Sequence, residues 1–174
     1  MQLTGRQIIE RGIVKGYCDE AIQQQGVDVR IRSVREVSSE LITIAKVDNI
    51  KIGKVPAQGK TSLPFYTEVN ARDGWFHLTP GYYDIELEES CIIPNNATLH
   101  YKTRSSLVRC GAIVHSGQFD AGFETDHMGC FLHVINTIKI EKGARIAQAI
   151  VFESDPVYSD DMYNGQWQGD NQRS

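Results

Sequence analysis

The chain has 174 residues, a hydrophobic fraction of 41% and a formal net charge of -4. A chain of this size can bury one sizeable core, so we expect a single folded domain. The acidic balance, with a pI near 5.7, argues against a broad basic surface for duplex nucleic acid but allows a small cationic pocket for one nucleotide. The expected partner is therefore a small molecule.

The cysteines and the first residues indicate the cellular compartment. The four cysteines form no CxxC pair and no dense framework, which is typical of free thiols in a reducing compartment: Cys18, Cys91, Cys110 and Cys130. The start of the chain contains no apolar segment typical of a secretion signal, and no apolar run reaches membrane-spanning length. We expect a cytoplasmic protein that binds no membrane and no nucleic acid.

The N-terminal residues carry the signal of a short helix. Thr4 followed by Gln7 fits a capping box, and Ile8 and Ile9 supply an apolar stripe. Gly12 is expected to end the helix.

A strand is predicted from Val27, because Val27, Val29 and Ile31 alternate with charged residues. Asp28 is then on the opposite face from the valines. A lone carboxylate on the polar face of a strand is most often solvated, so solvation of Asp28 is the first interpretation.

Strand and turn signals continue through the middle of the chain. Turn residues recur every eight to twelve positions, which is typical of an all-β sandwich or barrel. A loop is predicted over residues 54–62, and β-branched runs broken at Asp48-Asn49 predict two strands over residues 37–55. Further strands are expected around residues 75–78, 82–87 and 99–103.

The polar tail from Tyr158 onward has two interpretations. A disordered end is the simpler one. The alternative is a lid, since Trp167 lies between Gly165 and Gly169 and such a segment can fold over a ligand. We therefore divide the chain into one β domain, residues 1–157, and a flexible tail, residues 158–174.

A polar cluster begins at Arg104 and includes Ser105, Ser106 and Arg109. Guanidinium groups and short hydroxyl donors suit a polyanion such as a triphosphate. These donors can converge if the segment forms a strand end followed by a helical turn. The alternative is a capped short helix with a surface arginine.

The next residues predict a tight β-hairpin with one acid. An apolar run at 112–114 is followed by Gly117 and Gly122 on either side of Asp120. Glycines allow the backbone to approach a ligand closely. One carboxylate buried beside a phosphoanhydride can both orient and deprotonate a water molecule.

Five segments, in this order, resemble the deoxyuridine triphosphatases (dUTPases) and the related deoxycytidine triphosphate (dCTP) deaminases. They are Gln24 to Arg30, His77 to Gly81, Arg104 to Phe123, Lys142 to Gln148 and Tyr163 to Gln166. The resemblance implies an all-β distorted jelly-roll of the dUTPase type with a short N-terminal helix. It also implies a homotrimer, with sites at subunit interfaces, that uses Mg²⁺ to hydrolyse dUTP to dUMP and pyrophosphate.

The resemblance assigns a role to each candidate residue. Asp120 would be the catalytic base, and Asp28 would help hold the water shell of a metal ion. Phe123 would pack against the deoxyribose and exclude a 2′-hydroxyl group, unless it belongs to the core. The other substrate-binding residues implied are Arg104, Ser105, Ser106, Arg109, Gln118, Gln148, Tyr163 and Gln166.

Other functions stay open at this stage. The deaminases carry a glutamate where this chain has His133, if a short insertion over residues 125–128 is allowed. A dCTP deaminase, or a bifunctional enzyme, would then use a histidine to move protons. A catalytically silent nucleotide-binding protein of the same fold is the other alternative, and the choice between uracil and cytosine stays undecided.

A zinc site is a further, weaker alternative. Its ligands would come from Cys110, His115, His127, Cys130 and His133. On a strand His127 and His133 share a face and Cys130 lies on the other, which argues against a common metal ion.

Overall fold

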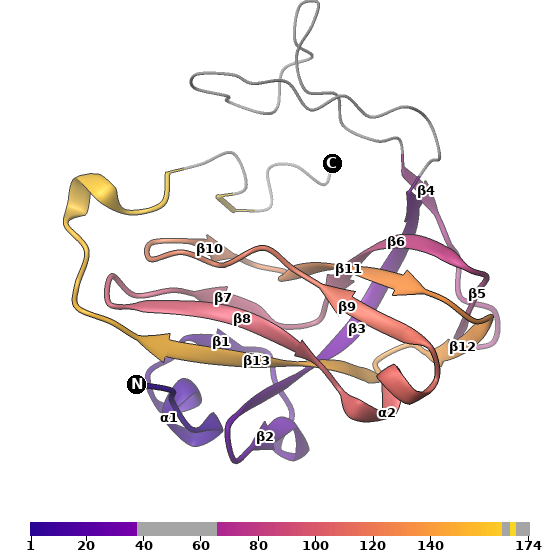
Figure 1. Cartoon of the computed structure of the whole chain (residues 1–174), viewed down its shortest axis with the longest axis horizontal. Coiled ribbons are helices and arrows are strands. Elements are labelled where there is room, and N and C mark those ends of the chain that lie inside the picture. The colour runs from indigo at the N-terminus through magenta and orange to yellow at the C-terminus, as the bar shows by residue number, and fades with distance from the viewer. Residues whose placement is uncertain (38–65, 165–167, 170–174) are drawn as a thin grey trace, which may run out of the picture.

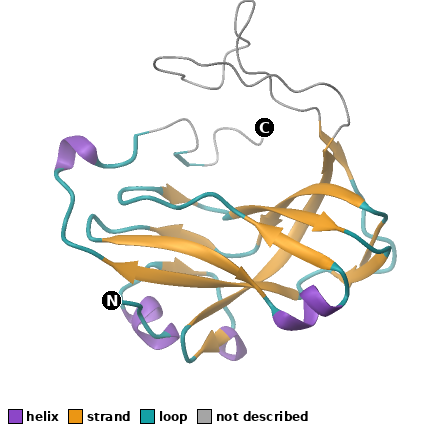
Figure 2. Cartoon of the chain, viewed as in Figure 1, coloured by secondary structure: helices purple, strands orange, loops and turns teal. Residues whose placement is uncertain are grey.

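The computed structural model describes residues 1–37, 66–164 and 168–169, and these form a mostly antiparallel β-structure (Figures 1 and 2). The predicted all-β class is therefore confirmed. The strands and loop predicted between residues 38 and 62 lie outside the described residues.

The elements follow one another closely along the chain. In order they are α1 (Gly5–Glu10), β1 (Val14–Lys15), η1 (Asp19–Ala21), β2 (Ile22–Gln23), β3 (Gly26–Val37), β4 (Tyr66–Glu68), β5 (Trp75–Leu78), β6 (Gly81–Leu87), β7 (Ser90–Ile92), β8 (Ala97–Thr103), α2 (Ser105–Arg109), β9 (Ala112–His115), β10 (Glu124–Thr125), β11 (Gly129–Val134), β12 (Ile138–Glu141), β13 (Arg145–Glu153) and η2 (Ser159–Asp161).

The main sheet curls into a nearly closed barrel. Its strands follow the order β8-β13-β3-β6-β11-β9. The hydroxyl group of Thr103, at the end of β8, donates to the carbonyl of Val114 in β9 at 3.1 Å and accepts from its N–H group at 2.9 Å. The first and last strands of the sheet are thus joined by a side chain, which satisfies backbone groups that an open edge would leave unpaired.

The predicted N-terminal helix is confirmed as α1. The Thr4 side chain accepts from the Gln7 N–H group, and the Gln7 side chain accepts from the Thr4 N–H group, which completes the capping box. The chain turns after the helix at Gly12, where φ is +67°. Gly5 is required at the first helical position because a Cβ atom there would lie 2.3 Å from the carbonyl oxygens of Gln23 and Gly26.

The barrel interior is filled by alternate residues of the central strands. Val27, Val29 and Ile31 of β3 are fully buried, as the alternation predicts. Leu87 of β6 and Leu132 of β11 are also fully buried. Each such side chain contributes about 1.5–3 kcal/mol of hydrophobic stabilisation.

The charged pair Arg30 and Glu89 joins β3 to the turn after β6. Arg30 Nε donates to Glu89 Oε1 at 2.6 Å, and the Arg30 backbone N–H group donates to Glu89 Oε2 at 2.8 Å. The Glu89 carboxylate is fully buried. Buried carboxylates persist in proteins when they are paired and hydrogen-bonded in this way.

The cysteines differ in the accessibility of their thiol groups. Cys110 is exposed, whereas Cys91 and Cys130 are buried. Burial raises the pKa of the Cys91 thiol to about 12.

Because the thiolate is the reactive form, we expect iodoacetamide at pH 8 to modify Cys110 in the folded protein and to reach Cys91 only after denaturation. Mass spectrometry of the labelled peptides measures both; rapid native labelling of Cys91 would contradict the burial of this strand.

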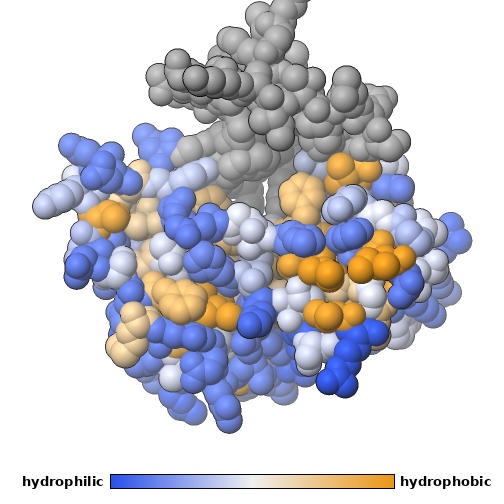
Figure 3. Space-filling model, in the orientation of Figure 1, coloured by the Kyte–Doolittle hydropathy of each residue, from blue (hydrophilic) through white to orange (hydrophobic). Residues whose placement is uncertain are grey.

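Some large apolar side chains reach the surface. Tyr82 of β6, Val108 of α2, Phe131 of β11 and Ile135 are each between 40% and 54% exposed. Figure 3 shows apolar side chains gathered on the visible face where β9 and α2 lie.

None of the helices in the described ranges is long and apolar enough to span a membrane.

Candidate functional site

The predicted polar cluster lies where β8 ends and α2 begins. Arg104 is the N-cap residue of α2, with extended backbone angles, and its carbonyl accepts from the N–H groups of Leu107 and Val108. Ser105, Ser106 and Arg109 are exposed on the short helix. The strand end and helical turn on which convergence of these donors depends are therefore present, and the exposed Arg109 also fits the alternative of a short helix with a surface arginine.

Asp28 of β3 lies beside this cluster. Its side chain is buried, with 2% exposure, so of the two interpretations of Asp28 the solvated carboxylate is wrong. Arg104 Nε lies 3.2 Å from Asp28 Oδ2, and Arg145 Nη1 lies 3.4 Å from the same oxygen. Strand periodicity alone misplaced Asp28 because β3 is covered on both faces near its start, where residues 26–29 are all buried.

The pKa of Asp28 reflects this position. Burial raises the pKa of the carboxyl group above its ordinary value, and the charges of Arg104 and Arg145 and a hydrogen bond from the Gln148 side chain oppose that rise. Burial is the larger effect. The arginines and Gln148 are thus what makes an ionised carboxylate tolerable at this place.

Gln148 of β13 is brought to Asp28 by strand pairing. The two residues are register partners in the β13–β3 pair, and Gln148 is also the register partner of Lys102 in β8. Gly26 lets the strands approach here, because a Cβ atom on it would lie 2.4 Å from the Ala149 carbonyl oxygen and 2.8 Å from Gln148 Cγ.

Arg145 is the residue that sequence analysis missed in this cluster. Arg145 belongs to the segment Lys142 to Gln148, in which the sequence predicts a substrate-binding role for Gln148 alone. Its separation from Asp28 along the chain hides the contact, and only the antiparallel pairing of β13 with β3 reveals it.

The predicted hairpin is formed by β9 and β11, which pair antiparallel. It is not tight, however, because residues 116–128 connect the two strands and include β10, which pairs with β7. Asp120 lies on this connection and is exposed rather than buried. Gln118 Nε2 donates to Asp120 Oδ1 at 2.6 Å, so these two predicted site residues do come together.

Phe123 packs into the hydrophobic core at one end of the connection, with 8% exposure. Its ring makes edge contacts with Phe119, at 5.2 Å between centroids, and with Tyr163, at 5.3 Å. Phe123 therefore packs as a core residue in this structure. Its contact with Tyr163 also links it to the tail.

The tail returns to the connection of its own chain (Figure 1). The Tyr163 N–H group donates to the Ala121 carbonyl at 2.7 Å, and the Gly169 N–H group donates to the Glu124 carbonyl at 2.8 Å. Gln168, which was not predicted, donates to the Gly122 carbonyl at 2.8 Å and accepts from the Glu124 N–H group at 3.3 Å. Gln166 and Trp167 lie outside the described residues.

The two halves of the predicted site are far apart within one chain. A bridge between Leu99 and Phe119 holds Asp120 beside the start of β8, whereas Arg104 follows the end of β8. Leu99 and Arg104 are five positions apart along the chain, a rise of roughly 16 Å at about 3.3 Å per residue. Within one chain Asp120 and the Arg104 cluster therefore lie at different places along β8.

The described ranges contain no group of three His, Cys, Asp or Glu side chains close enough to hold a metal ion. Cys130 faces the core, and His133 lies on the other face of β11, as expected for a strand. His133 stacks on Tyr82, with ring centroids 4.4 Å apart and planes at 11°. This contact gives the histidine a packing role.

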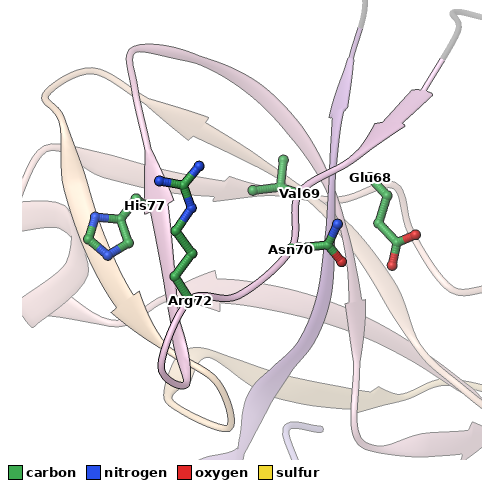
Figure 4. A pocket seen from close by; sticks show the side chains of 5 residues that line it. All are labelled: Glu68, Val69, Asn70, Arg72 and His77. Carbon is green, nitrogen blue, oxygen red and sulfur yellow. The ribbon is translucent and has the colours of Figure 1, made fainter.

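A separate hollow of about 380 Å³ lies near β4 and β5 (Figure 4). Arg72 and His77 lie near each other in the close-up, and Glu68 points away from them. None of the predicted site residues lines this hollow.

Comparison with known proteins settles the family. The family model described as dCTP deaminase-like matches residues 2–154. The chain belongs to the dCTP deaminase-like family. The match covers the barrel, the Arg104 cluster and the connection that carries Asp120, so the predicted family is confirmed.

Archaeal relatives of this dCTP deaminase-like chain are named as dUTP-hydrolysing enzymes. The probable deoxyuridine 5′-triphosphate nucleotidohydrolase of Methanococcoides burtonii is 31% identical over 88% of this chain and 84% of its own length. The probable enzyme of Aeropyrum pernix is 29% identical over 98% and 99%. The enzyme of Methanocaldococcus jannaschii is 31% identical over 87% and 89%. These names agree with the predicted kind of enzyme.

The fold is shared with a solved deaminase. The 2′-deoxycytidine 5′-triphosphate deaminase of Agrobacterium tumefaciens aligns with a TM-score of 0.60 and 15% identity over 86% of this chain. The chain spans about half of that longer protein, at 48%. The predicted fold of the dUTPase and deaminase type is confirmed.

Proposed function

We propose that this protein hydrolyses dUTP to dUMP and pyrophosphate. The observation that carries the proposal is the similarity to nucleotidohydrolases over nearly the whole length of both chains. The cationic cluster at Arg104 fits the triphosphate of such a substrate, because guanidinium forks bind phosphate oxygens with paired hydrogen bonds.

Each predicted residue has a part in the proposed reaction. Arg104, Ser105, Ser106, Arg109 and Gln148 bind the phosphate groups. Asp120 accepts a proton from the attacking water, and Gln118 fixes the orientation of that carboxylate through the hydrogen bond at 2.6 Å. Phe123 presents its ring to the deoxyribose, and Tyr163 and Gln166 close over the substrate from the tail.

Magnesium fits this site only in company with the substrate. Mg²⁺ is usually held by one or two carboxylates together with phosphate oxygens and waters, and here one buried carboxylate, Asp28, already faces two arginines. When bound, the ion would neutralise charge on the phosphate groups. Asp28 is then suited to its outer shell, through water, rather than to direct ligation.

The separation of Asp120 from Arg104 supports an assembly. We propose a homotrimer in which the acid of one subunit acts on a triphosphate held by a neighbour. The exposed apolar side chains near α2 and β11 offer a surface for such contacts. Sedimentation velocity tests this, since an active particle of 19.5 kDa would contradict a shared site.

The reaction itself is tested by incubation with dUTP and dCTP separately, with assays for pyrophosphate and ammonia. Pyrophosphate from dUTP alone supports the proposal. Ammonia from dCTP would support a deaminase or a bifunctional enzyme, the second candidate, which the match to the dCTP deaminase-like family model favours. Nucleotide binding without either product would indicate a silent member of the family. A cytoplasmic location stays a prediction from the sequence.

The tail, residues 158–174, is proposed as a flexible lid on the domain formed by residues 1–157. We expect truncation before Tyr158 to leave the barrel folded and to lower turnover of dUTP, because the lid residues are lost. Steady-state kinetics and circular dichroism measure the two effects. Unchanged kinetics would show that the contacts of Tyr163 and Gln168 only anchor the chain end.

A further inference from the structure

We infer that Arg145 is a second phosphate-binding arginine of this site and that Asp28 positions it beside Arg104. The inference rests on the proposed function, since it assigns a further residue to the same triphosphate site. Arg145 was not among the substrate-binding residues predicted from the sequence.

The two arginines share one carboxylate oxygen. Arg104 Nε and Arg145 Nη1 lie 3.2 Å and 3.4 Å from Oδ2 of Asp28. Two guanidinium groups that contact one atom must lie side by side. Arg104 comes from the end of β8 and Arg145 from the start of β13, so two rigid strands hold the pair.

The buried carboxylate of Asp28 does not by itself compensate both arginines. Asp28 is buried and carries one negative charge, while the two arginines always carry two positive charges. Gln148, which hydrogen-bonds Asp28, is neutral. Asp28 compensates one of these two positive charges, and the exposed Glu20 carboxylate interacts with Arg145 as well. A phosphate group at the mouth of the cluster would therefore be bound by the guanidinium donors of the pair rather than by a net charge.

The arginines are fixed in place but still have donors to offer. Arg145 Nη1 donates to the Glu20 carbonyl at 2.7 Å, and Arg104 Nη1 donates to the Arg145 carbonyl at 3.2 Å. The Nη2 group of neither arginine has a partner among the residues that the structure describes. The two side chains are 32% and 34% exposed, so these donors can reach a ligand.

Such an arrangement suits a phosphate group in particular. Paired guanidinium forks match the tetrahedral oxygens, and their prior fixation lowers the entropy lost on binding. The opposing explanation is that Arg145 serves only as a counter-ion for Asp28. That explanation predicts a loss of stability on mutation but no loss of phosphate affinity.

The test uses Arg145→Gln in the full chain, with inorganic tripolyphosphate as the probe in calorimetric titrations at 50 mM and 200 mM NaCl. We expect affinity to fall by roughly 10- to 100-fold, the usual effect of losing a charge-assisted contact, and the salt dependence to become shallower. The affinity for deoxyuridine, which lacks phosphate, is expected to stay unchanged.

Arg32→Gln is the matched control. Arg32 lies on the same strand as Asp28, is 43% exposed and pairs with Glu86 at 2.9 Å. Its loss removes the same charge from the protein as a whole, so affinity for tripolyphosphate should stay close to that of the parent.

Parent-like affinity in Arg145→Gln would overturn the inference and leave Arg145 as a counter-ion. If Arg145→Gln does not fold, the double variant Asp28→Asn/Arg145→Gln is compared with the single variant Asp28→Asn. Neither of these proteins contains an unpaired buried carboxylate. The double variant is expected to bind tripolyphosphate roughly 10- to 100-fold more weakly than the single variant. A parent protein that binds tripolyphosphate but does not hydrolyse dUTP would refute the proposed function alone. A parent that binds no tripolyphosphate would refute the inference.

Discussion

Replacing Asp120 by Asn is expected to lower the turnover of dUTP by roughly 10²–10⁴-fold, or about 3–5 kcal/mol of activation free energy. Asn keeps the size of the side chain and can still accept the hydrogen bond from Gln118. It cannot take a proton from water. The affinity for dUTP should change little, because the proposed phosphate-binding residues are Arg104 and its neighbours, and loss of a negative charge near a polyanion favours binding.

The measurement separates turnover from binding. Single-turnover kinetics report the chemical step, and titration with a non-hydrolysable dUTP analogue reports the dissociation constant. Asp126→Asn is the control, since Asp126 is an exposed carboxylate on the same connection between β9 and β11. Turnover by Asp120→Asn near the parent rate would assign Asp120 a structural role and leave the proposed hydrolysis without its base.

Replacing Glu89 by Ala is expected to lower the free energy of unfolding by about 3 kcal/mol. Removing one member of a buried ion pair typically costs about 3–5 kcal/mol because the other charge is left without compensation. The lower end applies here, since the Arg30 side chain is 25% exposed and can be partly hydrated. Urea unfolding followed by circular dichroism measures the change, provided that the slope with denaturant is the same for both proteins.

Glu88→Ala is the matched control for Glu89→Ala. Glu88 is the preceding residue, is 27% exposed and lies 3.3 Å from Arg32. Surface pairs contribute about 0–1 kcal/mol, so the control should unfold close to the parent. Equal stability of the two variants would show that the Arg30–Glu89 pair does not stabilise the barrel.

The same pair has a pH signature. Burial raises the pKa of Glu89, and the hydrogen bond to Glu89 raises the pKa of Arg30. The raised pKa of Arg30 reflects a favourable contact, whereas the raised pKa of Glu89 reflects the unfavourable burial of its charge. For Glu89 the effect of burial on the pKa is the larger one, because Glu89 is the more deeply buried partner. An acid with a raised pKa in the folded state binds its proton more readily when folded, so this group contributes more stability as the pH falls through that pKa.

The pH dependence of the stability contributed by Glu89 is measured by comparing the parent protein with Glu89→Gln, whose side chain has no proton to bind. The difference in unfolding free energy between the parent and this variant should widen in favour of the parent as the pH falls from neutral through the raised pKa. A difference that narrows over this range would mean that the attraction of Arg30 outweighs the burial of the carboxylate.

Local patterns were sufficient for several elements of this protein. The capping box at Thr4 and Gln7 produced α1, the alternation from Val27 produced β3, and Arg104 begins a helical turn after a strand, as predicted. These features depend on hydrogen bonds and side-chain periods within a few residues. Such interactions are visible in a sequence because the chain itself keeps the partners close.

The composition of the site depended on contacts between distant segments. Strand periodicity alone suggested a solvated Asp28, and the pairing of β3 with β13 instead buries it beside Arg145. The connection between β9 and β11 was expected to be tight and its acid buried, yet β10 pairs with β7 and leaves Asp120 exposed. Periodicity cannot report which strand covers a given face, because that is decided by the packing of the whole sheet.

The candidate site residues were therefore recognisable from the sequence as residue types and as segments: a cluster of arginines and hydroxyls, one acid between glycines, and an ordered set of family motifs. Only the tertiary structure decided how they are grouped. It joins Arg104, Arg145 and Gln148 around Asp28 and holds Asp120 at the other end of β8. The physical reason is that strand register brings together residues more than a hundred positions apart, and no local interaction encodes that register.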